Sequence, residues 1–140
     1  MNNSDDPPYS SSPEIIFIDD DPFMEKVFEK CFRPYDLSFE FYSCSKEGLA
    51  QILKKRPKLV ILDYWMPDMT GREIIVTLSE HHIFKTTSIA LCTSHELSGM
   101  ERIEFMTLGF EKVLSKPVKK SDVHELIQEY FPHKTLSKSA

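Results

Sequence analysis

Four short apolar segments of this sequence each run directly into residues whose side chains could do chemistry. The first is followed by Asp19 and Asp20, and the other three by Asp63, Thr93 and Lys116. If the fold brings these segment ends together, three carboxylates, a hydroxyl and an ammonium share one pocket. Neighbouring carboxylates repel one another unless a cation is present. The set is therefore typical of a Mg²⁺ site, because this hard ion takes oxygen ligands and shares its shell with phosphate.

A metal-bound carboxylate beside a lysine and a hydroxyl suits one reaction in particular. A carboxylate oxygen can attack phosphorus in line and give an aspartyl phosphate. Mg²⁺ and Lys116 would neutralise charge on the phosphoryl oxygens, and Thr93 would donate a hydrogen bond to one of them. No general base is needed, because an ionised carboxylate has no proton to lose.

Each of these residues also has an ordinary structural interpretation. An acidic run after a strand often caps a helix, and Asp21 before Pro22 is expected to do so. Thr93 could be a plain strand-end hydroxyl, and Lys116 a plain surface lysine. Their conjunction at strand ends favours the functional interpretation, since the roles of a site are fixed by mutual geometry.

The elements that must position these residues follow from the alternation of apolar runs and amphipathic stretches. The runs predict strands at 15–18, 37–42, 59–62, 88–92 and 112–115. The amphipathic stretches predict a helix that begins at 22 and ends before Pro34, and further helices at 48–55, from 71, from the Ser98 cap to Gly109 and from about 121 to 131. Capping-box patterns at Thr70 with Glu73 and at Ser98 with Glu101 mark two helix starts. Repeated strand–helix order with right-handed crossovers predicts an α/β fold, a doubly wound five-stranded parallel sheet that binds ligands where its strands end.

The apolar periodicity also predicts which side chains form the core. In the first helix the expected buried stripe is Phe23, Val27, Phe28, Cys31 and Phe32. Four methionines are expected to fill gaps in the core rather than to bind a ligand: Met66, Met69, Met100 and Met106.

Composition excludes several classes of protein. The chain has 140 residues and a net charge of −5, with no basic run, so we expect no direct binding to nucleic acid. Its longest apolar runs have four residues, too few to cross a membrane, and its first residues lack the basic and apolar regions of a secretory signal. Three separated cysteines without a CxxC pair favour reduced thiols and a cytoplasmic protein.

The ends of the chain differ in composition from its body. Residues 1–13 are rich in Ser, Pro and Asp, and residues 132–140 carry little apolar material, so both are expected to be tails, the first of them disordered. A single folded domain is expected between them, at 14–131.

Four motifs in this order resemble the receiver domain of two-component response regulators, in particular the single-domain, chemotaxis-regulator-like type. They are IIFIDDDP, LVILDYWMPDMTG, IALCTS and LSKP, and the resemblance covers residues 14–131. It implies a flavodoxin-like (βα)5 fold with strand order 2-1-3-4-5. It also implies a phosphorylation-dependent signalling switch that is no enzyme beyond its own phosphotransfer and autodephosphorylation.

The resemblance assigns the metal site and the phosphorylation site. It makes Asp63 the phosphoacceptor and Asp19 and Asp20 the acidic pair that holds Mg²⁺ together with Asp63. Trp65, two residues beyond the acceptor, would lend its backbone carbonyl to the ion. A bulky Trp65 side chain could also shield the acyl phosphate from water, and His95 occupies a second position that tunes phosphoryl loss.

The same resemblance assigns the switch. Thr93 would be the switch hydroxyl and Lys116 the phosphate-binding lysine, followed by a cis peptide to Pro117. The aromatic residue that the family usually carries three positions before the lysine is replaced here by Val113, and Phe110 stands where a small residue is usual. Both departures bear on how the phosphorylated state is transmitted.

The resemblance also implies partners. A sensor histidine kinase or a histidine phosphotransfer protein would supply the phosphoryl group. The output would be contact with a downstream protein target, unidentified, through the surface of the fourth helix, fifth strand and fifth helix, residues 100–131.

Two other functions remain open at the level of sequence. One is a haloacid-dehalogenase-type phosphatase with Asp19 as nucleophile, although Phe23 replaces the usual Thr or Val, no later acidic pair follows, and Asp63 would be unexplained. The other is an unphosphorylated receiver-like interaction module, for which Val113 is the sequence support. Substituting Asp19 and Asp63 in turn separates the first alternative from the receiver.

Overall fold

Strands and helices alternate along the whole described part of the chain, residues 12–134 of the computed structural model. The strands are β1 (Ile15–Ile18), β2 (Phe39–Tyr42), β3 (Leu59–Asp63), β4 (Ser88–Thr93) and β5 (Phe110–Ser115). The helices are α1 (Phe23–Phe32), α2 (Ser45–Lys55), α3 (Gly71–Glu80), α4 (Gly99–Leu108) and α5 (Lys120–Tyr130), with short 3₁₀ turns η1 (Arg33–Tyr35) and η2 (Ile83–Lys85).

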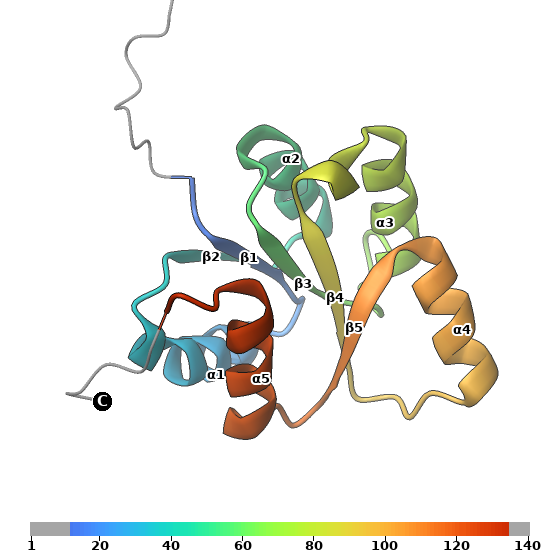
Figure 1. Cartoon of the computed structure of the whole chain (residues 1–140). Helices are drawn as coiled ribbons and strands as arrows, with labels where there is room; N and C mark the ends of the chain where they lie inside the picture. The colour runs from blue at the N-terminus through green and yellow to red at the C-terminus, as the bar shows by residue number, and fades with distance from the viewer. Residues whose placement is uncertain (1–11, 135–140) are drawn as a thin grey trace, which may run out of the picture.

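The five strands form one parallel sheet in the order β2-β1-β3-β4-β5, so the predicted fold class and strand order are confirmed. In Figure 1 the sheet runs through the middle of the molecule, with α1 and α5 on one face and α2, α3 and α4 on the other. Because all strands are parallel, their carboxyl ends lie along one edge, and β1 and β3 are direct neighbours there.

Each face of the sheet carries its own apolar core. On the α1 and α5 side, Phe17 of β1 stacks on Phe28 with ring centroids 4.1 Å apart and meets Phe32 edge to face at 5.1 Å. On the other side, Ile16 of β1 and Ile74 of α3 belong to one buried apolar cluster. All four residues of β1 are buried, as expected for a strand covered on both faces.

The helix starts that carry capping signals behave as predicted. Both capping boxes form: the Glu73 N–H donates to Thr70 Oγ1 at 3.2 Å, and the Glu101 N–H donates to Ser98 Oγ at 3.1 Å. At α1 the outcome differs by one residue: Pro22 is the N-cap residue and Phe23 the first helical one, although Asp21 Oδ1 accepts the Phe23 N–H at 2.9 Å.

Several element boundaries differ from the sequence prediction. β2 starts at Phe39 rather than residue 37, and α2 begins at Ser45, three residues before Gly48, because its first turn is polar and shows no apolar periodicity. β5 starts at Phe110, two residues early, and its register shifts between Ile89 and Ala90 of β4. That irregularity breaks the alternation from which strands are predicted.

The core prediction was wrong at some positions of α1 and α4. Phe23 is 64% exposed, and the buried residues of α1 are Met24, Phe28 and Phe32. Met100 and Met106 are not core gap-fillers, being 79% and 45% exposed. α4 has apolar residues on both of its faces, so periodicity alone could not tell which face packs on the sheet.

The predicted tails lie largely outside the described residues, which exclude 1–11 and 135–140. The described start of the C-terminal segment is tied to the domain, because Lys134 Nζ donates to the Asp36 carbonyl at 3.2 Å and lies 3.9 Å from Glu14 Oε2. Between residues 12 and 134, no helix is both long enough and apolar enough to span a bilayer.

Candidate functional site

The first acidic residues of the site stand where β1 ends. Asp19 is 1% exposed, and its N–H donates to the Tyr42 carbonyl of the neighbouring strand at 3.1 Å. Its Oδ1 accepts the Asp21 N–H at 3.0 Å, which holds the acidic turn in shape. Asp20 is exposed beside it. The turn therefore presents one buried and one open carboxylate.

Asp63 is the last residue of β3, the strand next to β1. Ligand oxygens of Asp19, Asp20 and Asp63 all lie within 4.8 Å of one another. Asp19 Oδ2 is buried and accepts no well-angled hydrogen bond from the described part of the chain. Three carboxylates that converge in this way are the donor set that a Mg²⁺ ion takes, so the residues fit the ion that the sequence implies.

Lys116 brings positive charge to the same carboxylates from the end of β5. Its Nζ is 2.8 Å from Asp19 Oδ2 and 3.7 Å from Asp63 Oδ2, and its side chain is 19% exposed. The Lys116 N–H donates to the Thr93 carbonyl at 2.9 Å, and the Lys116–Pro117 peptide is cis, as the resemblance implies. The lysine is thus held by backbone contacts and directed at the acids.

The charges of this cluster shift the pKa values of its members. Burial raises the pKa of Asp63 to about 6, the negative charges of Asp19 and Asp20 add to the rise, and Lys116 and the Trp65 N–H oppose it. Burial alone would lower the pKa of Lys116, but its ion pair with Asp19 and the charge of Asp63 raise it above the ordinary value. The ammonium therefore stays charged among the acids.

Thr93 is the last residue of β4, which lies between β3 and β5 in the sheet, and it is 2% exposed. Its Oγ1 accepts the His95 N–H at 3.1 Å, which uses the oxygen and leaves the hydroxyl proton to be donated elsewhere. His95 Nε2 in turn lies 3.5 Å from Glu101 Oε2 in the capping box of α4. The loop after Thr93 is therefore tied to the start of α4.

Trp65 follows Asp63 by two residues and is 62% exposed. Its indole meets the Tyr64 ring edge to face, with ring centroids 4.7 Å apart. A carbonyl contact from Trp65 to a metal, and shielding of the acyl phosphate by its indole, stay predictions.

Two residues that the sequence analysis gave no functional role shape the loop after Asp63. The Gly71 N–H donates to the Tyr64 carbonyl at 2.8 Å, and a Cβ at position 71 would lie only 2.9 Å from Tyr64 Cα. Asp68 Oδ2 accepts the Lys46 N–H at 3.2 Å, which anchors the loop to α2. The capping motif at Thr70-Gly71 was a sequence signal for the role of Gly71. Asp68 makes a contact between distant segments, and no local sequence pattern reveals it.

Family comparison agrees with this geometry. Residues 15–128 match the model of the response regulator receiver domain. The chain is 30% identical over 118 residues to the two-component response regulator ORR5 of Oryza sativa subsp. japonica, which covers 82% of this chain and 86% of that protein.

Solved structures share the fold. The chemotaxis protein CheY4 of Vibrio cholerae superposes with a TM-score of 0.74 at 24% identity, over 84% of this chain and 97% of that one. A co-crystal structure of the Saccharomyces cerevisiae histidine phosphotransfer protein Ypd1 with the receiver domain of Ssk1 matches with a TM-score of 0.74 at 15% identity, over 84% of this chain and 89% of that one.

Proposed function

The chain belongs to the receiver-domain family of two-component response regulators, which act as phosphorelay signalling switches, and on that premise we propose that Asp63 is the residue that accepts the phosphoryl group. The observation that carries the proposal is the contrast between two acids of one cluster. Asp19 is 1% exposed with Lys116 Nζ at 2.8 Å, whereas the Asp63 side chain is 10% exposed with the same ammonium 3.7 Å away. Of these two buried acids, Asp63 is the one more open to an incoming phosphorus atom.

The other residues of the site divide the remaining work. Asp19 and Asp20 would hold Mg²⁺ together with Asp63, and the backbone carbonyl of Trp65 would be a further ligand. When bound, the ion supplies positive charge to the phosphoryl oxygens. Lys116 adds a second positive charge, and the Thr93 hydroxyl donates a hydrogen bond to a phosphoryl oxygen. The carboxylate of Asp63 attacks phosphorus, and the donor leaves with the electrons of the bond that breaks.

The two alternative functions are less well supported by this arrangement. A phosphatase with Asp19 as nucleophile would need the most buried acid of the cluster to reach the substrate, past the lysine that contacts it. An unphosphorylated interaction module does not require the acids, the hydroxyl and the ammonium that the strand ends bring together. Both leave the position of Asp63 unexplained.

The phosphoryl donor is a phosphohistidine on a sensor kinase or a histidine phosphotransfer protein. A surface hollow of about 470 Å³ beside the acidic turn suits the docking of such a donor, since it combines exposed apolar area with positive charge. It is lined by Phe23, Lys26, Val27, Lys30, Cys31, Val118 and Lys120. The Ypd1 complex of a structurally similar receiver supports a partner of this type.

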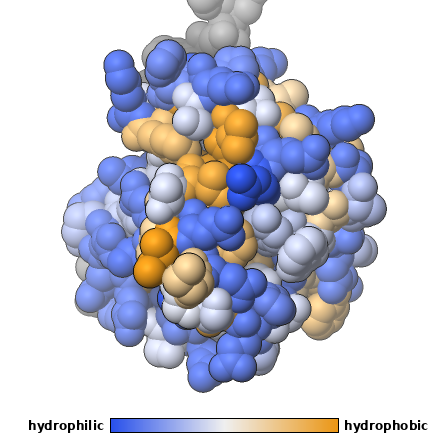
Figure 2. Space-filling view, turned by 90° about the vertical axis from the view of Figure 1, so that its right-hand side faces the viewer, coloured by the Kyte–Doolittle hydropathy of each residue, from blue (hydrophilic) through white to orange (hydrophobic). Residues whose placement is uncertain are grey.

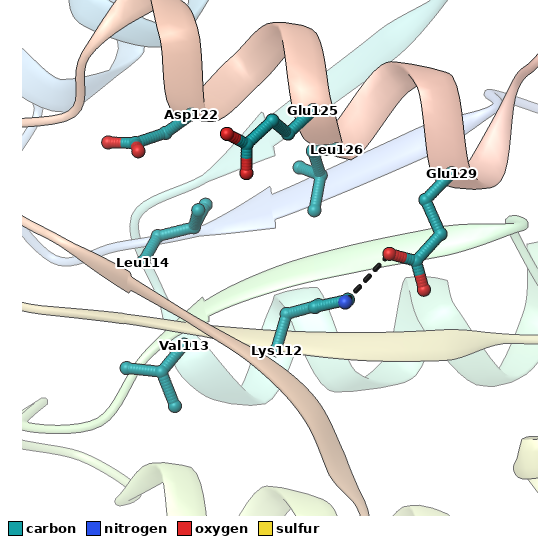
Figure 3. A pocket seen from close by; sticks show the side chains of 7 residues that line it. All are labelled: Lys112, Val113, Leu114, Asp122, Glu125, Leu126 and Glu129. Carbon is teal, nitrogen blue, oxygen red and sulfur yellow. Dashed lines mark ion pairs between the residues drawn. The ribbon is translucent and has the colours of Figure 1, made fainter.

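The output is contact with a protein target through the α4-β5-α5 surface. Met100, Ile103 and Met106 are exposed on α4, and Figure 2, which views the molecule from that side, shows hydrophobic patches among hydrophilic residues. Next to it a pocket of about 130 Å³ lies between β5 and α5, where Val113 stands in place of an aromatic residue and Lys112 pairs with Glu129 at 2.7 Å (Figure 3).

The activity proposed for the chain is limited to its own phosphotransfer and autodephosphorylation. A cytoplasmic location is supported by the three cysteines, which are free thiols: Cys31, Cys44 and Cys92.

Acetyl phosphate and Mg²⁺ test the proposed function without a partner. We expect the intact mass of the wild-type chain to increase by one phosphoryl group, and we expect no increase when EDTA removes the metal, because three carboxylates without a cation repel the incoming phosphate. Intact-mass spectrometry makes the measurement. A chain that gains no phosphoryl group with Mg²⁺ present would support the unphosphorylated module instead.

A further inference from the structure

Four aromatic rings connect the loop after Asp63 to β5 through α4. Trp65 meets Tyr64 at 4.7 Å between ring centroids, Tyr64 meets Phe105 at 4.8 Å, and Phe105 meets Phe110 at 5.9 Å. We call these four residues the aromatic row. Exposure falls along it, from 62% at Trp65 to 6% at Phe105 and 1% at Phe110. The row therefore leads from the surface of the site into the core beneath α4.

The loop end of the aromatic row is fixed to the phosphoacceptor. Tyr64 is bonded directly to Asp63, and its carbonyl accepts the Gly71 N–H at 2.8 Å. The close approach of Gly71 to Tyr64 leaves no room for even a Cβ at position 71. A change in charge and volume on Asp63 therefore acts on a loop whose Tyr64 ring packs against Phe105 of α4.

The helix end of the row carries the packing of α4. Phe105 is the buried residue of that helix, while Met100, Ile103 and Met106 are exposed on its outer side. A helix moves as a stiff unit, so a displacement at Phe105 also moves the exposed residues. Val113 of β5 has no ring with which to make a second aromatic link to α4.

We propose that Tyr64 and Phe105 are positioning residues that transmit the phosphorylation state of Asp63 to α4 and so regulate the exposed surface of that helix. The inference rests on the proposed function. Two packed aromatic rings resist separate movement, because their contact is lost steeply with distance. The Tyr64–Phe105 pair thus provides the aromatic link to α4 that Val113 cannot provide.

Hydrogen–deuterium exchange of the α4 amides, residues 99–108, tests the proposal. We expect addition of acetyl phosphate and Mg²⁺ to change their exchange rates in the wild type by about fivefold or more, the size of an ordinary allosteric coupling. In Phe105→Leu and in Tyr64→Leu the change is expected to fall below about twofold, while intact mass still shows one added phosphoryl group.

Two controls separate transmission from loss of packing. Tyr64→Phe keeps the ring and is expected to retain the wild-type response of α4. Phe39→Leu makes the same truncation on the other face of the sheet, where the ring meets Phe17 at 5.4 Å, and should also leave the response of α4 intact.

The outcomes distinguish this inference from the proposed function. A wild type that takes up no phosphoryl group contradicts the proposed function, and the inference is rejected with it. A wild type that is phosphorylated overturns only the inference if α4 does not respond, or if α4 responds equally in the wild type, Tyr64→Leu and Phe105→Leu.

Discussion

Replacement of Lys116 by methionine is expected to lower the free energy of unfolding by about 3 kcal/mol in the absence of divalent cations. The substitution keeps the length of the side chain and removes the charge. It leaves Asp19, 1% exposed, without the ammonium at 2.8 Å and still next to the carboxylates of Asp63 and Asp20. An unpaired buried charge costs more than the pair contributes. Urea unfolding at pH 8 in EDTA measures the difference.

Lys112→Met is the matched control, since Lys112 lies on β5, the strand that leads to Lys116, and pairs with Glu129 at 2.7 Å, but with both side chains about half exposed. Its effect is expected to stay below about 1 kcal/mol. Mg²⁺ should restore part of the stability of Lys116→Met, because the cation replaces the lost positive charge. Equal losses in the two variants would show that Lys116 is an ordinary surface lysine.

Asp63→Asn is expected to act in the opposite direction and to stabilise the metal-free domain by about 2–3 kcal/mol at pH 8. Burial, with the charges of Asp19 and Asp20, raises the pKa of Asp63 from 3.8 to about 6, so the folded state disfavours the ionised carboxylate despite Lys116. An amide carries no charge and removes that penalty. Thermal or urea unfolding of the two chains in EDTA gives the difference.

The pH dependence of this effect follows from the direction of the shift. Well below the ordinary pKa of 3.8 Asp63 is protonated in both states, and as the pH rises through about 6 the folded wild type loses stability that Asp63→Asn keeps. The two curves should therefore separate between pH 4 and about 7. Asp36→Asn removes an exposed carboxylate at a left-handed position that asparagine tolerates, and should not reproduce the separation. Curves that stay parallel would mean that burial and the neighbouring charges do not raise the pKa of Asp63 in the folded state.

Much of the site could be predicted from the sequence because parallel strands place their ends along one edge. The acids at the ends of β1 and β3 and the lysine after β5 are each predicted from a local apolar run and the residue that follows that run. Which acid the lysine contacts more closely could not be read this way. That choice depends on side-chain geometry, and it is what separates Asp19 from Asp63 in the proposed mechanism.

The outer surface of α4 and the aromatic row could not be predicted for a different reason. Met100, Ile103 and Met106 share a helix with the buried Phe105, so hydrophobic spacing identifies a helix without identifying its inner face. Tyr64 and Phe105 lie far apart in sequence, and contacts of that kind come from packing between elements. Phe23 was misplaced likewise, because Met24 takes the inner position that the phenylalanine was expected to occupy.

Identification of the modified residue tests the central claim most directly. After incubation with acetyl phosphate and Mg²⁺, reductive trapping of the acyl phosphate and peptide mass mapping locate the aspartate that captured phosphorus. Modification of Asp63 alone, absent in Asp63→Asn, is the result we predict. Modification of Asp19 or Asp20 in the wild type would contradict the assignment of the phosphoacceptor.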